Sequence, residues 1–270
     1  SLATAGTGGF GIMNDSFVSY STSAQLVTTI FMIIFGVNFN VYYYLLIKDF
    51  KSAFKCEEVR WYFGIIIVSV LLIAFNITSM FNSFFEALKH AFFNVGSVIT
   101  TTGFASHDFN TWPEFSKTIL LILMFIGGSP VGTAGGIKNV TIVILLLTSI
   151  AVVKNRNDVS LFNRRLSDTA IRKAMAVTTF SFFTAFISSM LLSCVIHTSL
   201  LDILFETISA TATVGLSRDL TSTLPLIGKL IIIVTMYFGR IGPISIAVAF
   251  YKKDKKDNLI RNPIEEISVG

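Results

Sequence analysis

The chain is divided into long uncharged stretches that are separated by short charged connections. Three stretches contain no Asp, Glu, Lys or Arg, and they are 32, 25 and 28 residues long. Two more are apolar but interrupted, one by a Gly-rich patch and Lys138 and the other by Arg240. The continuous stretches cover residues 16–47, 61–85 and 174–201, and the interrupted ones cover 118–153 and 230–251. Because about 20 apolar residues cross a bilayer as a helix, the pattern predicts about five membrane crossings.

Basic residues collect on alternate connections between these stretches. The other side of the membrane holds four Lys and Arg residues against seven Asp and Glu residues. Because Lys and Arg are enriched in cytoplasmic connections, we predict a multi-pass protein of the bacterial cell membrane with a cytoplasmic C-terminus. Trp61, Tyr62 and Trp112 lie near the ends of stretches and are predicted to anchor at the membrane interface. Fifteen Lys and Arg residues lie in the connections of the cytoplasmic side, at residues 48–60, 154–173 and 252–270.

The composition agrees with a membrane protein. Hydrophobic residues make up 53% of the 270 residues and charged residues 14%, against about 25% charged residues in an ordinary soluble domain. These values exclude a disordered chain and argue against a soluble enzyme. The net charge of +5 follows from membrane orientation and does not indicate nucleic-acid binding. The chain begins at Ser1 without Met, so we expect an internal piece of a longer protein.

A short Thr-x-Gly motif occurs three times along the chain. Its three glycines are 94 and 112 residues apart, so the repeat unit is about one hundred residues. Each full unit contains a crossing helix, a shorter apolar segment that returns to the membrane, the motif, and a second crossing helix. Ser83 and Glu86 form a capping box at the start of one returning helix. The three copies are Thr7-Gly8-Gly9, Thr101-Thr102-Gly103 and Thr213-Val214-Gly215.

Loops of this kind are suited to a cation pore. Non-helical backbone at membrane depth is tolerated only where it is buried or lines water, and glycine allows the conformations that such a loop needs. Carbonyl groups aimed at a common axis replace the hydration shell of a cation. The C-terminal ends of the returning helices add negative potential. Three carboxylates four to six residues after the motif glycines would concentrate cations at an outer mouth, namely Asp15, Asp108 and Asp219.

Several strings resemble the TrkH/KtrB/HKT superfamily of bacterial, fungal and plant potassium transporters. They are TAGTGGFG, TTTGFASHDFNTWP and ATATVGLS, together with GGSPVGTAGGIK and GRIGP. The resemblance covers the whole chain. It implies four helix, pore-loop, helix units in one polypeptide around a single pore, assembled as a homodimer in the lipid bilayer. It also implies a cytosolic nucleotide-binding regulator with RCK domains, docked on the basic connections 48–60 and 154–173.

The same comparison divides the chain into units. Residues 1–50 are the pore loop and second helix of unit two, 51–154 are unit three, 155–251 are unit four, and 252–270 are a cytoplasmic tail. Unit one and the first helix of unit two are missing, so this piece alone is not expected to conduct. The predicted fold class is an all-α polytopic membrane protein with repeated helix, re-entrant pore loop, helix units around a pseudo-four-fold pore.

The Gly-rich patch within residues 118–153 has two explanations. A packing kink between helices is the commoner reason for membrane glycines, but five glycines in ten residues favour an irregular loop that lines the pore. The resemblance implies an intramembrane gate, and Pro130, Val131 and Gly132 depart from the usual GSTAGG pattern. Arg240 either clamps helix ends or forms an electrostatic barrier, and Lys138 either joins it or snorkels to the interface. The predicted gate comprises Gly127, Gly128, Gly132, Thr133, Gly135, Gly136, Lys138 and Arg240.

The leading interpretation is a non-enzymatic, pore-forming subunit for potassium uptake, with K⁺ as the transported ion and no organic cofactor. A sodium-permeable or sodium-coupled transporter of the same fold remains an alternative. An intramembrane serine protease using Ser129 is another, although Pro130 interrupts its motif. A non-conducting receptor or scaffold would have no use for the repeated loops. Residues 6–11 match the dinucleotide-binding pattern G-x-G-x-x-G, but no βαβ unit is predicted around them.

Overall fold

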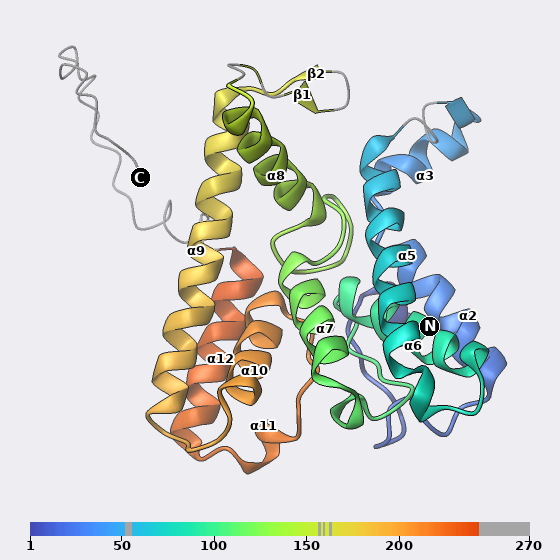
Figure 1. Cartoon of the computed structure of the whole chain (residues 1–270), viewed down its shortest axis with the longest axis vertical. Helices are drawn as coiled ribbons and strands as arrows, with labels where there is room; N and C mark the ends of the chain where they lie inside the picture. The colour runs from blue at the N-terminus through green and yellow to red at the C-terminus, as the bar shows by residue number, and fades with distance from the viewer. Residues whose placement is uncertain (52–55, 156–157, 159, 162–163, 243–270) are drawn as a thin grey trace.

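The computed structural model describes residues 1–51, 56–155, 158, 160–161 and 164–242 (Figure 1). The described residues are helical apart from loops and a two-residue pairing of strands. The first part of the chain contains α1 (Leu2–Ala5), α2 (Thr22–Phe35) and α3 (Phe39–Leu46). The middle part contains α5 (Glu57–Ile77), η1 (Thr78–Met80), α6 (Phe84–Ile99), η2 (Phe109–Thr111), α7 (Glu114–Ile126) and α8 (Asn139–Val153). The last part contains β1 (Ser160–Leu161), β2 (Arg164–Arg165), α9 (Asp168–Ser193), α10 (Leu200–Ala212), α11 (Leu220–Thr223) and α12 (Leu226–Ile241).

The first predicted crossing, residues 16–47, is broken into α2 and α3, which meet at 91°. Gly36 ends α2 in a crowded position, because a Cβ there would lie 2.4 Å from the Tyr62 hydroxyl and 2.7 Å from a Thr100 methyl carbon. Asn38 then starts α3 by accepting a hydrogen bond from the Asn40 amide at 2.9 Å, as an N-cap does. The first predicted crossing is therefore a bent pair of helices rather than a single straight one.

The middle part surrounds the short helix α6. Ser83 is its N-cap and accepts a hydrogen bond from the Phe85 amide at 3.3 Å, so the predicted start of the returning helix is confirmed. The helix packs against α2, α5 and α7, and most residues from Ala87 onward are buried. In Figure 1, α7 and α8 follow one another with a long loop between them. This loop, residues 127–138, is the Gly-rich loop of the following sections.

In the last part, α9, α10 and α12 pack side by side (Figure 1). Hydroxyl pairs join them, with Ser188 and Thr235 2.7 Å apart and Ser189 and Thr207 also 2.7 Å apart. The β1 and β2 strands pair antiparallel in the connection before α9. The predicted tail, residues 252–270, and the end of the last predicted crossing lie outside the described residues.

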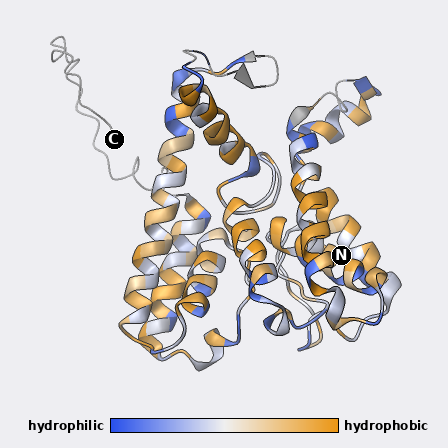
Figure 2. Cartoon of the chain, viewed as in Figure 1, coloured by the Kyte–Doolittle hydropathy of each residue, from blue (hydrophilic) through white to orange (hydrophobic). Residues whose placement is uncertain are grey.

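The described helices cross a membrane less continuously than the sequence suggests. Two of them, α5 and α9, are long and apolar enough to span by themselves, and the bent pair of α2 and α3 would make a third. The stretch 118–153 is divided between α7 and α8, and α12 has 16 residues. Orange residues dominate these helices in Figure 2. By length and composition the described helices thus provide two or three of the five predicted crossings, and the other two stretches contain shorter helices.

The largest buried cluster lies among α5, α6 and α7. Two predicted interface anchors belong to it, since Tyr62 is 0% exposed and Trp112 is 2% exposed. The Tyr62 hydroxyl donates to the Ile33 carbonyl at 3.2 Å, and the Trp112 indole nitrogen donates to His107 Nδ1 at 3.2 Å. Both polar ends are therefore satisfied inside the protein, and the anchor prediction is wrong for these two residues.

Candidate ion pathway and gate

The three Thr-x-Gly loops share one backbone conformation. Their threonines have φ angles of 48°, 54° and 56° in chain order. Their last glycines have φ angles of 67°, 84° and 86°. A residue other than glycine rarely adopts a positive φ, so three such threonines at matching positions are a structural repeat. These T-x-G loops are Thr7–Gly9, Thr101–Gly103 and Thr213–Gly215.

Each T-x-G loop also ends its helix with the same pair of hydrogen bonds. In the middle loop the Thr101 amide donates to the Val98 carbonyl at 3.0 Å, and the Thr102 amide donates to the Ser97 carbonyl at 2.9 Å. This pairing is a Schellman motif, which satisfies carbonyls at a helix end. In the first loop the Thr7 amide donates to the Thr4 carbonyl at 3.4 Å and the Gly8 amide to the Ala3 carbonyl at 2.8 Å. In the third loop the Thr213 amide donates to the Ala210 carbonyl at 3.2 Å and the Val214 amide to the Ser209 carbonyl at 2.9 Å.

The loops lie beside one another in chain order. A Cβ on Gly9 would lie 2.1 Å from the Thr102 carbonyl oxygen, and one on Gly103 would lie 2.3 Å from the Val214 carbonyl oxygen. Each of these glycines is therefore required by its neighbour as well as by its φ angle. A Cβ on Gly215 would meet no described atom within 4 Å. The three loops form an arc that is open beside Gly215.

The Gly-rich loop contacts the threonine of every T-x-G loop. The Thr7 hydroxyl donates to the Thr133 carbonyl at 3.2 Å, and the Gly135 amide donates to the Thr101 hydroxyl at 2.6 Å. At Gly135, a Cβ would lie 2.3 Å from the Thr213 hydroxyl oxygen. The backbone at residues 133–135 therefore lies directly against one end of the arc.

The Gly-rich loop also forms hydrogen bonds to the break between α2 and α3. The Ser129 amide donates to the Gly36 carbonyl, and the Thr133 hydroxyl donates to the Phe35 carbonyl, each at 3.2 Å. Carbonyls at a helix end lack partners within their own helix, so the break makes acceptors available to the loop. The charge pattern alone did not reveal that Gly36 contacts the Gly-rich loop.

The remaining predicted gate glycines hold the loop close to itself and to its neighbours. Gly127 and Gly136 have positive φ angles of 71° and 76°. A Cβ on Gly127 would lie 2.3 Å from the Gly135 carbonyl oxygen. A Cβ on Gly128 would lie 2.5 Å from the Ala134 methyl carbon, and a Cβ on Gly132 would lie 3.2 Å from the Val37 carbonyl oxygen. These contacts favour the irregular loop over the packing kink.

The two predicted gate cations have different positions. The Lys138 ammonium group donates to the Ala134 carbonyl, so this side chain turns back onto the Gly-rich loop. Arg240 lies in the last turn of α12, which ends at Ile241, and its side chain is exposed in this chain. Its charge repels that of Lys138. The α12 helix ends there, with Gly242 at a φ angle of 85°. Residues 243–251 of the last predicted crossing lie outside the described residues, so the position of Arg240 near the centre of that crossing stays a prediction.

The three predicted mouth carboxylates, Asp15, Asp108 and Asp219, are all exposed. Asn110 joins two of them, since its amide donates to Asp108 at 2.9 Å and its side chain donates to Asp219 at 3.3 Å. Asp15 accepts a hydrogen bond from Ser19. Over the part of the chain that the structure describes, His, Cys, Asp and Glu form no cluster of three or more that could hold a metal ion.

Sequence reasoning did not identify the ion pair beside this mouth. Arg218 Nη1 lies 2.7 Å from Asp202 Oδ1, and Arg218 Nε donates to the Asn110 side-chain oxygen at 3.3 Å. The pair is largely buried, with side chains 14% and 28% exposed. It links the loop after Gly215 to α10 and to the middle part of the chain. Single charges in a sequence carry no signal of such a partnership.

Comparison with known proteins identifies the family. The family described as "TrkH: Cation transport protein" matches residues 1–262. The chain belongs to the TrkH family. This family consists of transporters, so the protease alternative is excluded, and Ser129 is in fact a fully buried residue whose hydroxyl accepts from the Asn139 amide group at 3.4 Å.

Several relatives of this TrkH-family chain are potassium uptake proteins. The chain is 30% identical to Ktr system potassium uptake protein B of Bacillus subtilis (strain 168), over 97% of this chain and 60% of that protein. It is 28% identical to Trk system potassium uptake protein TrkH of Escherichia coli (strain K12), over 93% of this chain and 54% of that protein. It is also 28% identical to potassium/sodium uptake protein NtpJ of Enterococcus hirae, over 97% of this chain and 61% of that protein. The chain therefore spans about 60% of the length of such relatives.

The crystal structure of the potassium transporter TrkH from Vibrio parahaemolyticus has the same fold. The two superpose with a TM-score of 0.82 at 22% sequence identity, over 92% of this chain and 56% of that one. The TrkH-family chain is thus a helical, polytopic, membrane-integral protein, as the sequence predicts.

Proposed function

We propose that this chain is part of the pore-forming subunit of a potassium uptake system. The supporting observation is the arc of T-x-G loops, in which Gly9 and Gly103 each lie against a carbonyl of the next loop. The carbonyls of Thr7–Gly9, Thr101–Gly103 and Thr213–Gly215 bind partly dehydrated K⁺ as the transported ion. The names of the Ktr and Trk relatives support potassium as that ion.

The arc is completed by a further loop beside Gly215. This position is the open side of the arc, and the relatives are longer than this chain. On this proposal residues 1–50 are an incomplete unit, 51–154 and 155–251 are two full units, and 252–270 are a tail. The three units present supply three of four filter loops, so ion conduction belongs to the longer protein.

The Gly-rich loop is the gate of this pathway. It contacts the threonines of all three loops, so an ion that leaves the arc on that side meets the backbone of residues 133–135. The loop must move for ions to pass. Lys138 turns its ammonium group onto this loop, and Arg240 lies in the last turn of α12. Their two positive charges oppose a cation while the loop is closed.

The proposed assembly is a homodimer in the cell membrane with the basic connections on the cytoplasmic side. Connections 48–60 and 154–173 dock a cytosolic RCK-type regulator that binds nucleotides. The carboxylates Asp15, Asp108 and Asp219 attract cations to the outer mouth. No organic cofactor takes part in this function.

The filter proposal is tested by Gly103→Ser in the full-length protein. A Cβ there would lie 2.3 Å from the Val214 carbonyl at a φ angle of 84°, so we expect Rb⁺ uptake and the preference for K⁺ over Na⁺ to fall sharply. Gly64→Ser is the matched control, because an added Cβ on α5 meets no described atom within 4 Å. The measurement is Rb⁺ uptake in cells that lack other potassium uptake systems. Unchanged Rb⁺ uptake and unchanged ion preference in Gly103→Ser would contradict the filter assignment.

A sodium-permeable pore is the second candidate, because one relative is named a potassium/sodium uptake protein. The two candidates differ in ion competition. Excess Na⁺ that abolishes Rb⁺ uptake by the full-length protein would favour the second candidate, and Rb⁺ uptake that persists in excess Na⁺ would favour the first.

A further inference from the structure

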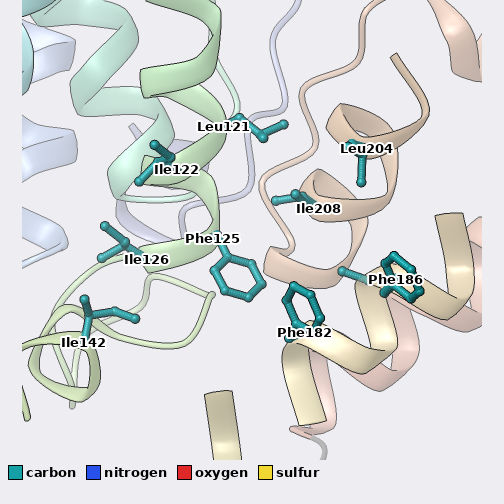
Figure 3. Close-up of a pocket in the computed structure, with 10 residues that line it drawn as sticks. Leu121, Ile122, Phe125, Ile126, Ile142, Phe182, Phe186, Leu204 and Ile208 are labelled. Atoms are coloured by element: carbon teal, nitrogen blue, oxygen red, sulfur yellow. The ribbon is translucent and has the colours of Figure 1, made fainter. Parts of the chain in front are cut away.

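An apolar cavity of about 340 Å³ lies between α7, α8, α9 and α10. Figure 3 shows Phe125 from α7 and Phe182 and Phe186 from α9 around it. Every described residue that lines the cavity is Leu, Ile, Phe or Ala, so these side chains offer no hydrogen-bond donor or acceptor. The volume is within the range of about 300–1,000 Å³ that is usual for small-molecule pockets. The occupant of such a site is apolar.

The rim of this cavity is exposed on the surface of the described helices. Ile122, Phe182 and Phe186 are 52%, 55% and 49% exposed, and α9 is one of the two helices long and apolar enough to span alone. Exposed apolar side chains on a spanning helix contact lipid. A lipid acyl chain therefore has direct access to the cavity, whereas water has no polar partner there.

Positive charges lie at the ends of α8 and α9, two of the four helices that border the cavity, on the side that the proposed function makes cytoplasmic. Lys154 directly follows α8, and Arg172 lies near the start of α9; both side chains are exposed. Arg172 and Phe186 are 14 residues apart, nearly four helical turns, so they share a face of α9. Arg172 and Phe182 are separated by about 15 Å of helix, which is half of the roughly 30 Å hydrocarbon thickness. A phosphate near Arg172 thus places its acyl chain at the depth of the cavity.

We propose that this cavity binds an acyl chain of an anionic phospholipid, whose phosphate is held by Lys154 and Arg172. The regulatory consequence rests on the gate proposed above. The carbonyls of Phe125 and Ile126, in the cavity wall, accept hydrogen bonds from the amides of Ile137 and Lys138 at 3.3 and 2.8 Å. Both ends of the Gly-rich loop are therefore attached to this wall. A bound acyl chain braces the wall, stabilises the loop against the T-x-G loops, and slows uptake.

The binding site is tested by filling it. The full-length protein is reconstituted in phosphatidylcholine vesicles with or without phosphatidylglycerol, and the lipid that it retains after extraction is measured by native mass spectrometry. Leu204→Trp fills the cavity from α10, and Ile187→Trp is the matched control on the exposed surface of α9. We expect the wild type and Ile187→Trp to retain phosphatidylglycerol and Leu204→Trp to lose most of it. Equal retention by all three proteins overturns the site.

The lipid class is tested by removing the charges. Lys154→Gln with Arg172→Gln is expected to lower retention of phosphatidylglycerol several-fold. Lys48→Gln with Lys51→Gln is the matched control on the other basic connection and is expected to leave it unchanged. If the wild type retains phosphatidylcholine as well as phosphatidylglycerol, or if the double variant retains both normally, the anionic class is wrong. Cross-linking of two copies through cysteines placed in the cavity would identify a second copy of this chain as the occupant and would overturn the proposal.

Rb⁺ uptake into the same vesicles separates this inference from the proposed function. Slower uptake in vesicles with phosphatidylglycerol, relieved by Leu204→Trp, supports lipid control of the gate. Uptake without any retained phosphatidylglycerol overturns the lipid site and supports the pore. Retained phosphatidylglycerol without any uptake overturns the proposed function and the regulatory step, while it supports the binding site.

Discussion

At the scale of single residues, the T-x-G loops depend on threonines in a conformation that threonine rarely adopts. Thr7, Thr101 and Thr213 all have positive φ angles, which cost about 1–3 kcal/mol for each such residue unless the surroundings hold them. Two of their hydroxyls bond the Gly-rich loop, at Thr133 and Gly135. The sequence predicted the glycines of this motif from their backbone freedom. It gave no sign that the threonines also contact the Gly-rich loop.

The anchoring of the Gly-rich loop is tested by Thr133→Val, which keeps the side-chain shape and removes the hydroxyl that donates to the Phe35 carbonyl. Losing this hydrogen bond costs the closed loop about 1 kcal/mol, so we expect Rb⁺ uptake by the full-length protein to rise about fivefold wherever opening limits it. Thr118→Val is the control, because its hydroxyl donates to the Glu114 carbonyl on α7, away from the loop. Lower or unchanged Rb⁺ uptake in Thr133→Val would contradict the proposal that the Gly-rich loop is the gate.

At the scale of elements, the main lesson is that apolar length does not define a continuous helix. Residues 16–47 are uncharged throughout, yet α2 ends at Gly36, where Tyr62 and Thr100 leave no room for a side chain. Both of those residues come from other elements. The stretch 118–153 breaks where its own sequence is Gly-rich, so that break could be predicted. The composition of the chain therefore signals the break in residues 118–153 but not the break after α2.

The packing of α9 against α12 is tested by a double-mutant cycle of Ser188→Ala and Thr235→Val. Their hydroxyls are 2.7 Å apart and buried, and such bonds between membrane helices contribute about 0.6 kcal/mol on average. We expect a coupling energy of that size in thermal unfolding of the detergent-solubilised protein. Ser149→Ala is the control, because its hydroxyl bonds only the Leu145 carbonyl of its own helix and is exposed. A coupling energy of zero would show that the pair does not stabilise the packing.

At the scale of the whole molecule, polar contacts hold the middle and last parts of the chain together around the outer mouth. Asn110, from the middle part, contacts Arg218 and Asp219 of the last part. Arg218 is also paired with Asp202 on α10. The position of the third T-x-G loop relative to the second therefore depends on a few residues that lie outside both loops.

This linkage is tested by Arg218→Gln. Removing one partner of a largely buried ion pair leaves the Asp202 charge uncompensated, and we expect the free energy of unfolding to fall by about 1–3 kcal/mol. We also expect the preference for K⁺ over Na⁺ to weaken. Arg165→Gln is the matched control, because its ion pair with Asp158 has side chains 72% and 57% exposed and contributes about 0–1 kcal/mol. Equal effects of the two substitutions would mean that the Arg218 pair has no special role.

The sequence by itself determined the membrane class, the location of the apolar stretches, the three T-x-G motifs and the Gly-rich patch. Each of these follows from local properties, namely the transfer of side chains into hydrocarbon and the backbone freedom of glycine. Tertiary packing determines which carbonyls Gly9 and Gly103 face, what surrounds Gly36 at the end of α2, and the contact of residues 133–135 with all three loops. Those contacts join residues as far as 126 positions apart, and they depend on how separate units pack. No local property of the chain specifies that packing, and so Tyr62 and Trp112 are core residues rather than interface anchors.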